Sequence, residues 1–294
     1  MFPYIGGKHK HVGWLDEIFP RDSYTKFVEV FGGAGWVTVK SKRITNADTR
    51  IYNDYNPWIA NIYECFRSRL PELREQLHTY PKSNRALYQQ FQQDIFGNNQ
   101  QFTIPNVELA AKYLYLQTQL FSGVTLSIDS PVYFQDTASD GKYGSKYDAL
   151  LNKLSDEKYI TRLQEISHVE NIDCIDLIQK WDSPDTFFYV DPPYFNKEFL
   201  YVKEFPREKH LELAETLKHS RGRWCLSYYD FPELQEWYPE NRYHWHRQSV
   251  FRWSSTRGHR KLDERVNRNG TEIAIMNYDP VVLTPYQQLF TEVM

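Results

Sequence analysis

The sequence predicts an α/β protein in which a doubly wound, mainly parallel sheet carries an inserted, mainly helical domain. Short β-prone runs alternate with amphipathic stretches near both ends of the chain, and the middle interrupts this alternation. Residues 186–190 form a continuous β-prone run, as expected of a central parallel strand that is buried on both faces. The order βαβ, insertion and βαβ again is typical of an open α/β sheet.

The first βαβ unit is expected between residues 26 and 66. Residues 26–31 and 50–54 indicate two strands, and a glycine-rich loop at residues 32–35 follows the first of them. A helix is expected to begin at about Pro57, because proline suits the first turn of a helix. Residues 67–154 then differ in composition, being rich in Gln, Asn, Tyr and Lys.

Within residues 67–154, helices are expected near 84–96 and 107–121, and Gly, Ser, Asp and Pro at 127–145 indicate a loop or hairpin. The α/β alternation then resumes. Beside the β-prone run at 186–190, the expected elements are strands at 169–173, 223–227 and 271–276 and a helix at 208–219. We therefore expect a core domain of residues 1–66 and 155–294, with an inserted domain at 67–154.

Composition limits the class of protein. With 294 residues, of which 41% are hydrophobic, the chain can bury a substantial core. Three widely spaced cysteines suggest no disulfide framework or zinc cluster, so a reducing cytoplasm is the expected setting. The sequence contains no apolar run long enough for a signal peptide or a membrane span. The net charge of −3 argues against simple non-specific nucleic-acid binding, although it says nothing about local patches.

The glycine loop predicts a nucleoside site. Glycines at 32, 33 and 35 let the backbone turn sharply and approach a ligand closely. Asp54 lies 19 positions after Gly35, at the end of the next predicted strand, where a carboxylate can accept hydrogen bonds from ribose hydroxyls. The loop lacks the third glycine of a dinucleotide fingerprint and the Gly-Lys-Ser/Thr ending of a phosphate loop, so a nucleoside without phosphates fits better. An ordinary tight turn is the alternative interpretation.

The Asp-Pro-Pro-Tyr segment at 191–194 predicts chemistry on an aromatic amine. Two prolines end the strand and stiffen the turn, which fixes the Asp191 carboxylate, the Pro192 carbonyl and the Tyr194 ring. An aromatic amine is a poor nucleophile because its lone pair is delocalised into the ring. Two acceptors that hold both of its N–H groups can aim that lone pair at a methyl donor. Positioning and electrostatics then suffice for the reaction, and no strong general base is required. The alternative is a plain strand ending.

Six segments together resemble the Dam-type N6-adenine DNA methyltransferases of the D12 class, over most of the chain and in the α order of motifs. The segments are residues 4–8 (aromatic-x-Gly-Gly-Lys), 27–35 (the glycine motif), 52–56 (the ribose segment), 171–173 (the strand end beside the cofactor adenine), 191–194 (the catalytic motif) and 271–280 (the closing strand). Tyr4 stands where the family often has tryptophan. Residues 67–154 do not clearly match the known recognition domains, so the target sequence is not given.

This resemblance implies a site-specific enzyme with a Rossmann-like methyltransferase sheet, which transfers a methyl group from S-adenosylmethionine to N6 of an adenine flipped out of double-stranded DNA. The implied target-recognition domain is residues 67–154. The implied residues of the S-adenosylmethionine site, taken with the glycine loop, are Tyr4, Lys8, Phe31, Gly33, Gly35, Asp54, Asp173 and Asp191. The implied catalytic residues are Asp191, Pro192, Pro193 and Tyr194.

A basic stretch is the main candidate for contact with DNA. Residues 242–268 contain eight Lys/Arg and two acidic residues, with aromatic side chains interleaved and a glycine at 258. This composition suits a loop that grips phosphates beside a flipped base. The candidate residues are Arg252, Arg257, Arg260 and Lys261. The alternative is a solvated, charged loop.

Lys142 and Lys146 form a second candidate for DNA contact, for which a plain turn is an equal alternative. The histidines at 9, 11, 244 and 246 have no partners at ligand spacing, so no metal is expected.

Three other functions stay open from the residues alone: an amino methyltransferase acting on cytosine N4 or on RNA, a nucleotide-dependent dehydrogenase, and a catalytically silent DNA-binding homologue. Aspartate ahead of Pro-Pro-Tyr favours adenine, and the missing third glycine disfavours the dehydrogenase.

Overall fold

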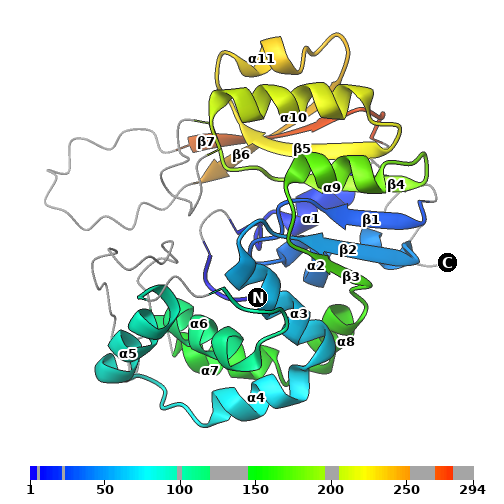
Figure 1. Cartoon of the computed structure of the whole chain (residues 1–294). Coiled ribbons are helices and arrows are strands. Elements are labelled where there is room, and N and C mark those ends of the chain that lie inside the picture. The colour runs from blue at the N-terminus through cyan, green and yellow to red at the C-terminus, as the bar shows by residue number, and fades with distance from the viewer. Residues whose placement is uncertain are drawn as a thin grey trace, which may run out of the picture.

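The computed structural model describes residues 1–4, 7–21, 24–97, 101–119, 145–195, 205–251 and 269–280. Within these residues, seven strands form one sheet in the order β3-β2-β1-β4-β5-β7-β6 (Figure 1). The strands are β1 (Lys26–Glu29), β2 (Thr49–Asn53), β3 (His168–Glu170), β4 (Thr186–Val190), β5 (Arg223–Tyr229), β6 (His244–Phe251) and β7 (Asn269–Met276). The prediction of a doubly wound α/β sheet is therefore confirmed.

The strand order reverses at β1, and this reversal positions the site. Strand β1 pairs in parallel with β2 on one side and with β4 on the other, so that Val28 lies opposite both Ile51 and Phe188. Strand β7 runs antiparallel to both β5 and β6. In open α/β sheets ligands bind at the carboxyl ends of the strands, at the point where the order reverses. That point lies between the ends of β1 and β4.

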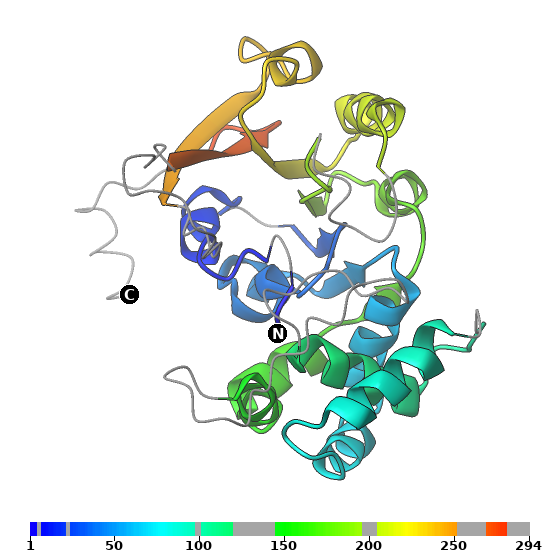
Figure 2. The same cartoon turned by 90° about the vertical axis from the view of Figure 1, so that its left-hand side faces the viewer.

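Apolar side chains of alternating strand residues divide the core into two halves. In β4, which is buried throughout, Phe187 and Tyr189 belong to one cluster and Phe188 and Val190 to the other. The first cluster includes side chains of the helices α1 (Val12–Ile18), α2 (Trp36–Lys40) and α3 (Pro57–Ser68). The second includes side chains of α9 (Cys174–Trp181), α10 (Arg207–His219) and α11 (Leu234–Trp237). The sheet is thus a layer between two sets of helices (Figures 1 and 2).

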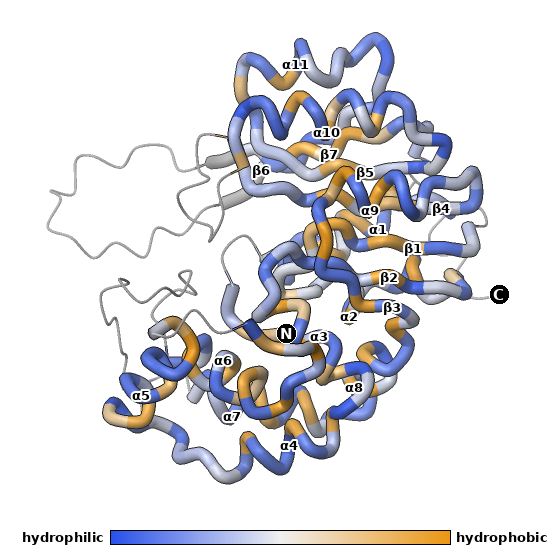
Figure 3. Tube along the Cα trace, viewed as in Figure 1, coloured by the Kyte–Doolittle hydropathy of each residue, from blue (hydrophilic) through white to orange (hydrophobic). Residues whose placement is uncertain are grey.

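The middle of the chain forms helices beside α3. They are α4 (Leu70–His78), α5 (Arg85–Phe96), α6 (Val107–Gln119), α7 (Lys146–Lys153) and α8 (Glu157–Gln164), and a 3-10 turn, η1 (Arg43–Asn46), precedes β2. Helix α6 contacts α3, α4, α5 and α7 and is buried along most of its length. Hydrophobic and hydrophilic stretches alternate along these helices (Figure 3). The apolar side chains of these helices belong to the same cluster as those of α3. The division of the chain into a core domain and an inserted domain at residues 67–154 stays a proposal.

Two local predictions were wrong. The strand expected at residues 169–173 ends at Glu170, because Asp173 instead caps α9 by accepting a hydrogen bond from the Ile175 N–H at 2.9 Å. The loop expected from residue 242 onward contains β6, which pairs antiparallel with β7. Strand β6 lies at the edge of the sheet, so backbone pairing holds it without the apolar alternation that would mark it in the sequence. No helix in the described part of the chain is both long and apolar enough to cross a bilayer.

Candidate active site

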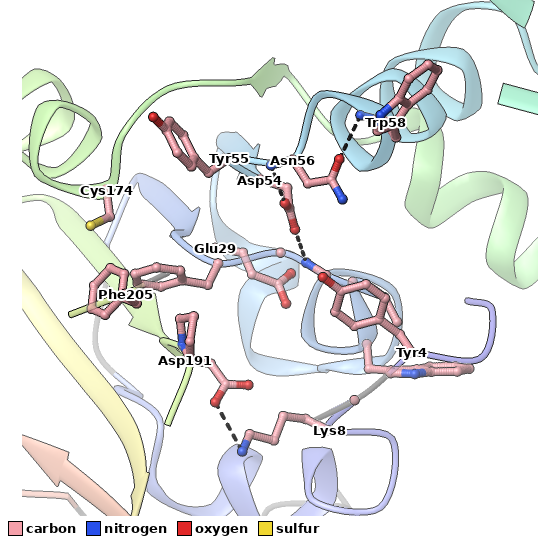
Figure 4. A pocket seen from close by; sticks show the side chains of 18 of the residues that line it. Tyr4, Lys8, Glu29, Asp54, Tyr55, Asn56, Trp58, Cys174, Asp191 and Phe205 are labelled. Atoms are coloured by element: carbon pink, nitrogen blue, oxygen red, sulfur yellow. Dashed lines mark hydrogen bonds and ion pairs between the residues drawn. The ribbon is translucent and has the colours of Figure 1, made fainter. Parts of the chain in front are cut away.

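A pocket of about 510 Å³ opens at the carboxyl ends of β1, β2 and β4, and we call it the strand-end pocket (Figure 4). Its volume lies in the range of about 300–1,000 Å³ that small-molecule sites occupy. Its lining comes from the glycine loop, the segments after β2 and β4, the start of the chain and the starts of α9 and α10. The lining residues are Tyr4, Gly7, Lys8, Glu29, Phe31, Gly32, Gly33, Ala34, Gly35, Trp36, Asp54, Tyr55, Asn56, Pro57, Trp58, Asp173, Cys174, Asp191, Pro193, Phe205, Pro206 and Lys209.

The structure brings together every residue that the sequence suggested for the cofactor. The eight residues that line the pocket as expected are Tyr4, Lys8, Phe31, Gly33, Gly35, Asp54, Asp173 and Asp191. Of the catalytic segment, Asp191 and Pro193 line the pocket. Pro192 is buried and Tyr194 is partly buried, and neither is among the lining residues. The roles of these residues stay predictions.

The glycine loop is held closely against neighbouring aromatic rings. Gly33 and Gly35 have φ angles of +51° and +59°, which residues that carry a side chain rarely adopt. A Cβ atom at Gly33 would also lie 2.8 Å from Cε1 of Tyr4. The Tyr52 hydroxyl donates a hydrogen bond to the Gly33 carbonyl at 2.6 Å. The loop therefore needs glycine both for its backbone angles and for the space that Tyr4 takes.

Asp54 accepts two backbone hydrogen bonds at the end of β2. Its Oδ2 accepts from the Gly33 N–H at 2.7 Å and its Oδ1 from the Asn56 N–H at 2.8 Å (Figure 4). Burial raises the pKa of Asp54 to about 6, although both N–H groups oppose the rise. A carboxylate oxygen has two lone pairs, so each can still accept a bond from a ligand hydroxyl. Asp54 is thus a fixed acceptor in the pocket wall.

Glu29 is a pocket residue that the sequence reasoning missed. It is the last residue of β1, it is buried, and its Oε2 accepts hydrogen bonds from the N–H and the hydroxyl of Thr38. Burial raises the pKa of Glu29 to about 8. The signal was present in the sequence, because a carboxylate inside an apolar strand that leads into a glycine loop must be buried and hydrogen-bonded.

The far end of the pocket is formed by α9 and α10. Lys209 of α10 places its Nζ 2.9 Å from Oδ1 of Asp173 and 2.9 Å from Oε2 of Glu212. Burial lowers the pKa of Lys209, but its hydrogen bonds to these carboxylates outweigh burial and raise it above its usual value. Phe205 lies beside this pair in the lining. Neither Lys209 nor Phe205 carried a sequence signal, since only the packing of α10 on α9 brings them to the pocket.

The catalytic segment begins with an ion pair between Asp191 and Lys8. The Asp191 Oδ1 lies 3.1 Å from the Lys8 Nζ, and both side chains are largely buried (Figure 4). Burial raises the pKa of Asp191 to about 7, although the charge of Lys8 opposes the rise. Burial lowers the pKa of Lys8, but the charges of Asp191 and Glu272 outweigh it and raise that pKa above its usual value. The charge of Lys8 therefore only partly offsets the cost of burying the Asp191 carboxylate.

Tyr194 is held at its ring and at its hydroxyl. Its ring lies 5.7 Å from that of Tyr228 at an interplanar angle of 28°, and 5.4 Å from that of Tyr229. Its hydroxyl donates to Oε1 of Glu272 and accepts from the Nζ of Lys8. Glu272 belongs to β7 and was not singled out from the sequence. The segment after β4 is therefore tied to the start of the chain, to β5 and to β7.

The model of the D12 class N6 adenine-specific DNA methyltransferase family matches residues 4–252. The chain belongs to this family. Membership makes it an enzyme that methylates adenine in DNA, and it agrees with the seven-stranded sheet described above. None of the curated proteins matches the chain.

Most of the residues expected to contact DNA in this methyltransferase lie outside the described residues: Lys142, Arg252, Arg257, Arg260 and Lys261. Lys146 is described and is the first residue of α7. It lines a second cavity, of about 320 Å³, together with Met1 and Lys153, and burial lowers its pKa. The structure therefore does not place Lys146 in the strand-end pocket.

Two of the histidines considered as metal ligands, His9 and His246, contact tryptophan side chains. His246 accepts a hydrogen bond from the Trp14 indole N–H at 2.8 Å, and the ring of His9 lies edge-on to Trp36 with centroids 4.4 Å apart. Among the residues that the structure describes, no three or more His, Cys, Asp or Glu side chains are grouped as a metal ion would need.

Proposed function

We propose that this chain transfers a methyl group from S-adenosylmethionine, bound in the strand-end pocket, to N6 of an adenine turned out of duplex DNA. One observation carries the proposal. Asp191, the first residue of the catalytic segment, lines the same pocket as the glycine loop and the carboxylate of Asp54 (Figure 4). A nucleoside-binding surface and an acceptor for an amino group therefore share one cavity, which methyl transfer between two adenine-containing molecules requires.

The lining of the pocket suits a positively charged nucleoside. Apart from Glu29, whose pKa burial raises to about 8, its carboxyl groups are those of Asp54, Asp173 and Asp191. Its two lysines are each held by two carboxylates, Lys8 by Asp191 and Glu272 and Lys209 by Asp173 and Glu212. This arrangement opposes a ligand that carries phosphates and favours a cationic one. When bound, S-adenosylmethionine supplies an electrophilic methyl group on its sulfonium.

Particular residues would hold that cofactor. Asp54 would accept hydrogen bonds from the ribose hydroxyls, and Asp173 would accept one from the amino group of the cofactor adenine. The glycine loop fits this role, since a side chain at Gly33 would press against Tyr4. Phe31 and Phe205, whose ring centroids lie 5.6 Å apart, add apolar surface to the wall.

Asp191 would act on the target adenine by position and charge. Its carboxylate accepts an N–H of the amino group, and the Pro192 carbonyl is the proposed second acceptor, so that the nitrogen lone pair points away from the base plane. Lys8 holds the Asp191 carboxylate through Oδ1, at 3.1 Å. After transfer the nitrogen carries a surplus proton. The Asp191 carboxylate, whose pKa burial raises above its usual value, can accept that proton.

The DNA side of the proposal rests on charge. We propose that residues 252–268 and Lys146 contact phosphates, and that the helices of residues 67–154 contribute to the recognition of the target. Turning the base out costs a few kcal/mol of unstacking and unpairing, which phosphate contacts on both sides of the target can offset. Tyr194 is the aromatic side chain proposed to lie against the flipped adenine.

The proposal is tested by expressing the chain in a host that lacks DNA methylation and mapping modified bases by single-molecule sequencing. We expect N6-methyladenine within one sequence context. Asp191→Ala should abolish the modification and leave the fold intact, as chemical denaturation would show. The control is Asp182→Ala, because Asp182 is a carboxylate that binds the backbone at Arg221 and Gly222 and does not line the pocket. N4-methylcytosine, methylated RNA, or DNA binding without methylation would each contradict the proposal.

A further inference from the structure

A buried carboxylate on β7 contacts the catalytic segment without lining the pocket. Glu272 is 5% exposed, and its Oε1 accepts hydrogen bonds from the Nζ of Lys8 and from the Tyr194 hydroxyl. In the sheet it pairs with Tyr229 of β5 and with Gln248 of β6. The neighbouring residues Ile273 and Ala274 are fully buried and apolar, as expected in the middle of a sheet. A charged side chain at this position needs a physical reason.

Stability does not supply that reason. An ion pair taken out of water gains little over apolar side chains of the same volume, because desolvation offsets the attraction. Here the cost of desolvation is larger than for a simple ion pair, because two buried carboxylates, Asp191 and Glu272, share the single ammonium group of Lys8. A core residue selected only for packing would be apolar. The arrangement therefore points to a task at the neighbouring catalytic segment.

We propose that Glu272 is a positioning residue for methyl transfer, which holds the Lys8 ammonium between itself and Asp191 and fixes the Tyr194 hydroxyl. This inference rests on the proposed function, because it concerns the groups that would receive the target adenine. Glu272 acts through Lys8 and Tyr194 and is not expected to touch the substrate. Without it, Lys8 is free to move wholly onto Asp191.

The geometry around Tyr194 supports this role. The ring is packed against Tyr228 and Tyr229 of β5, and the hydroxyl is bound from the other end by Glu272 and Lys8. A ring held at both ends cannot rotate without breaking one of these contacts. The Lys8 Nζ also lies 4.9 Å from the ring centroid of Tyr194. Glu272 thus orders both the aromatic side chain and the cation that borders Asp191.

The charge of Glu272 also acts on Asp191. Among the described residues, the groups that interact electrostatically with Asp191 are Lys8 from the start of the chain, Glu29 of β1, Tyr189 of β4, Cys225 of β5 and Glu272 of β7. Burial is the main cause of the raised pKa of Asp191; Lys8 opposes it and Glu272 adds to it. Removing the charge of Glu272 leaves the attraction of Lys8 to Asp191 alone. The pKa of Asp191 should then fall.

The first test is Glu272→Gln, which keeps the shape of the side chain and an acceptor oxygen but removes the charge. The acidic limb of the profile of kcat against pH should move to lower pH by about one unit, the smaller end of what one nearby charge produces. A matched control is Glu165→Gln, because Glu165 pairs with the largely buried Arg50 and neither residue lines the pocket. The control should leave the profile unchanged.

Glu272→Ala removes the charge and the acceptor together. Its kcat should fall by at least about tenfold, since small misplacements at a reacting centre have effects of this order or larger. Its KM for S-adenosylmethionine should rise less than its kcat falls, because Glu272 reaches the cofactor site only through Lys8. Glu272→Gln should recover part of the kcat that the alanine variant lacks. Equal losses of kcat and of cofactor affinity would indicate a purely structural role and overturn the inference.

A measurement without turnover separates this inference from the proposed function. The carboxyl carbon of Asp191 is titrated by ¹³C NMR in the protein without cofactor or DNA, and its signal is assigned from its loss in Asp191→Asn. We expect a lower pKa for Asp191 in Glu272→Gln than in the wild type. An unchanged titration overturns the inference even if the enzyme methylates adenine. If the wild type methylates nothing, the proposed function fails, and the shifted titration still supports the coupling of Glu272 to Asp191.

Discussion

Replacing Asp54 by asparagine removes one charge from the strand-end pocket and keeps the shape of the side chain. Asp54 accepts hydrogen bonds from the Gly33 and Asn56 N–H groups, at 2.7 and 2.8 Å. An asparagine has one carbonyl oxygen, so its amide group must face one of these two donors. The variant therefore loses one backbone hydrogen bond and the negative charge that a ligand hydroxyl would meet.

The two losses have different effects on stability and on binding. Leaving one buried N–H without an acceptor costs about 1–3 kcal/mol of stability. Against this, burial raises the pKa of Asp54 from 3.8 to about 6, so the ionised side chain costs about 3 kcal/mol at neutral pH, which the variant avoids. The free energy of unfolding should therefore change little. Binding loses charge-assisted hydrogen bonds worth about 1.5–3 kcal/mol, a factor of about 10 to 150 in Kd.

Isothermal calorimetry with S-adenosylmethionine measures this loss, and chemical denaturation measures stability. Binding by the wild type needs ionised Asp54, so its affinity should rise as the pH passes upward through about 6, and Asp54→Asn should lack that rise. The free energy of unfolding changes in the opposite direction. Because the pKa of Asp54 is higher in the folded state, the wild type should lose stability as the pH rises from about 4 to 6, and the variant should not. The control is Asp182→Asn, since Asp182 binds two backbone N–H groups away from the pocket. A variant affinity within twofold of the wild type at pH 7.5 would refute the reasoning.

Three further predictions follow from the same structure and sequence. Gly33→Ala should lose about 1–3 kcal/mol of stability, as measured by denaturation, because of its φ of +51° and the contact with Tyr4, and unchanged stability would contradict the close approach. Arg257→Gln combined with Arg260→Gln should flatten the slope of log affinity against log salt by about 0.9 for each phosphate that the variant no longer binds, with cofactor affinity unaltered. Lys146→Gln should do the same on a smaller scale, and a wild-type slope in filter binding would remove this residue from the DNA path.

The sequence by itself determined the sheet and the centre of the pocket. The run 186–190 predicts β4 with its observed bounds, because a strand buried on both faces is rich in β-branched and aromatic residues and does not alternate with charged ones. The glycine loop and the Asp-Pro-Pro-Tyr segment are readable for a related reason. Each is a short stretch whose function requires particular backbone angles, and only glycine or proline supplies them. All eight residues expected at the cofactor site therefore line one pocket.

The edge of the sheet was less readable. Strand β6 was expected to be a loop, because its residues have no apolar alternation. Backbone hydrogen bonds to β7 hold this strand in place. Because every residue type except proline can form them, they produce no recognisable pattern in the sequence. The end of β3 was misplaced by three residues, since Asp173 satisfies the first turn of α9 and not the strand ladder.

Only the tertiary structure decided which charged side chains meet. Lys8 and Glu272 are 264 residues apart in the chain, and no spacing rule connects them. Their contact exists because β7 inserts antiparallel beside β5, which brings its buried carboxylate next to the segment that follows β4. Lys209 reaches Asp173 only through the packing of α10 on α9. Local backbone requirements can be recognised from consecutive residues. The pairing of buried charges depends instead on strand order, which the packing of the whole core determines.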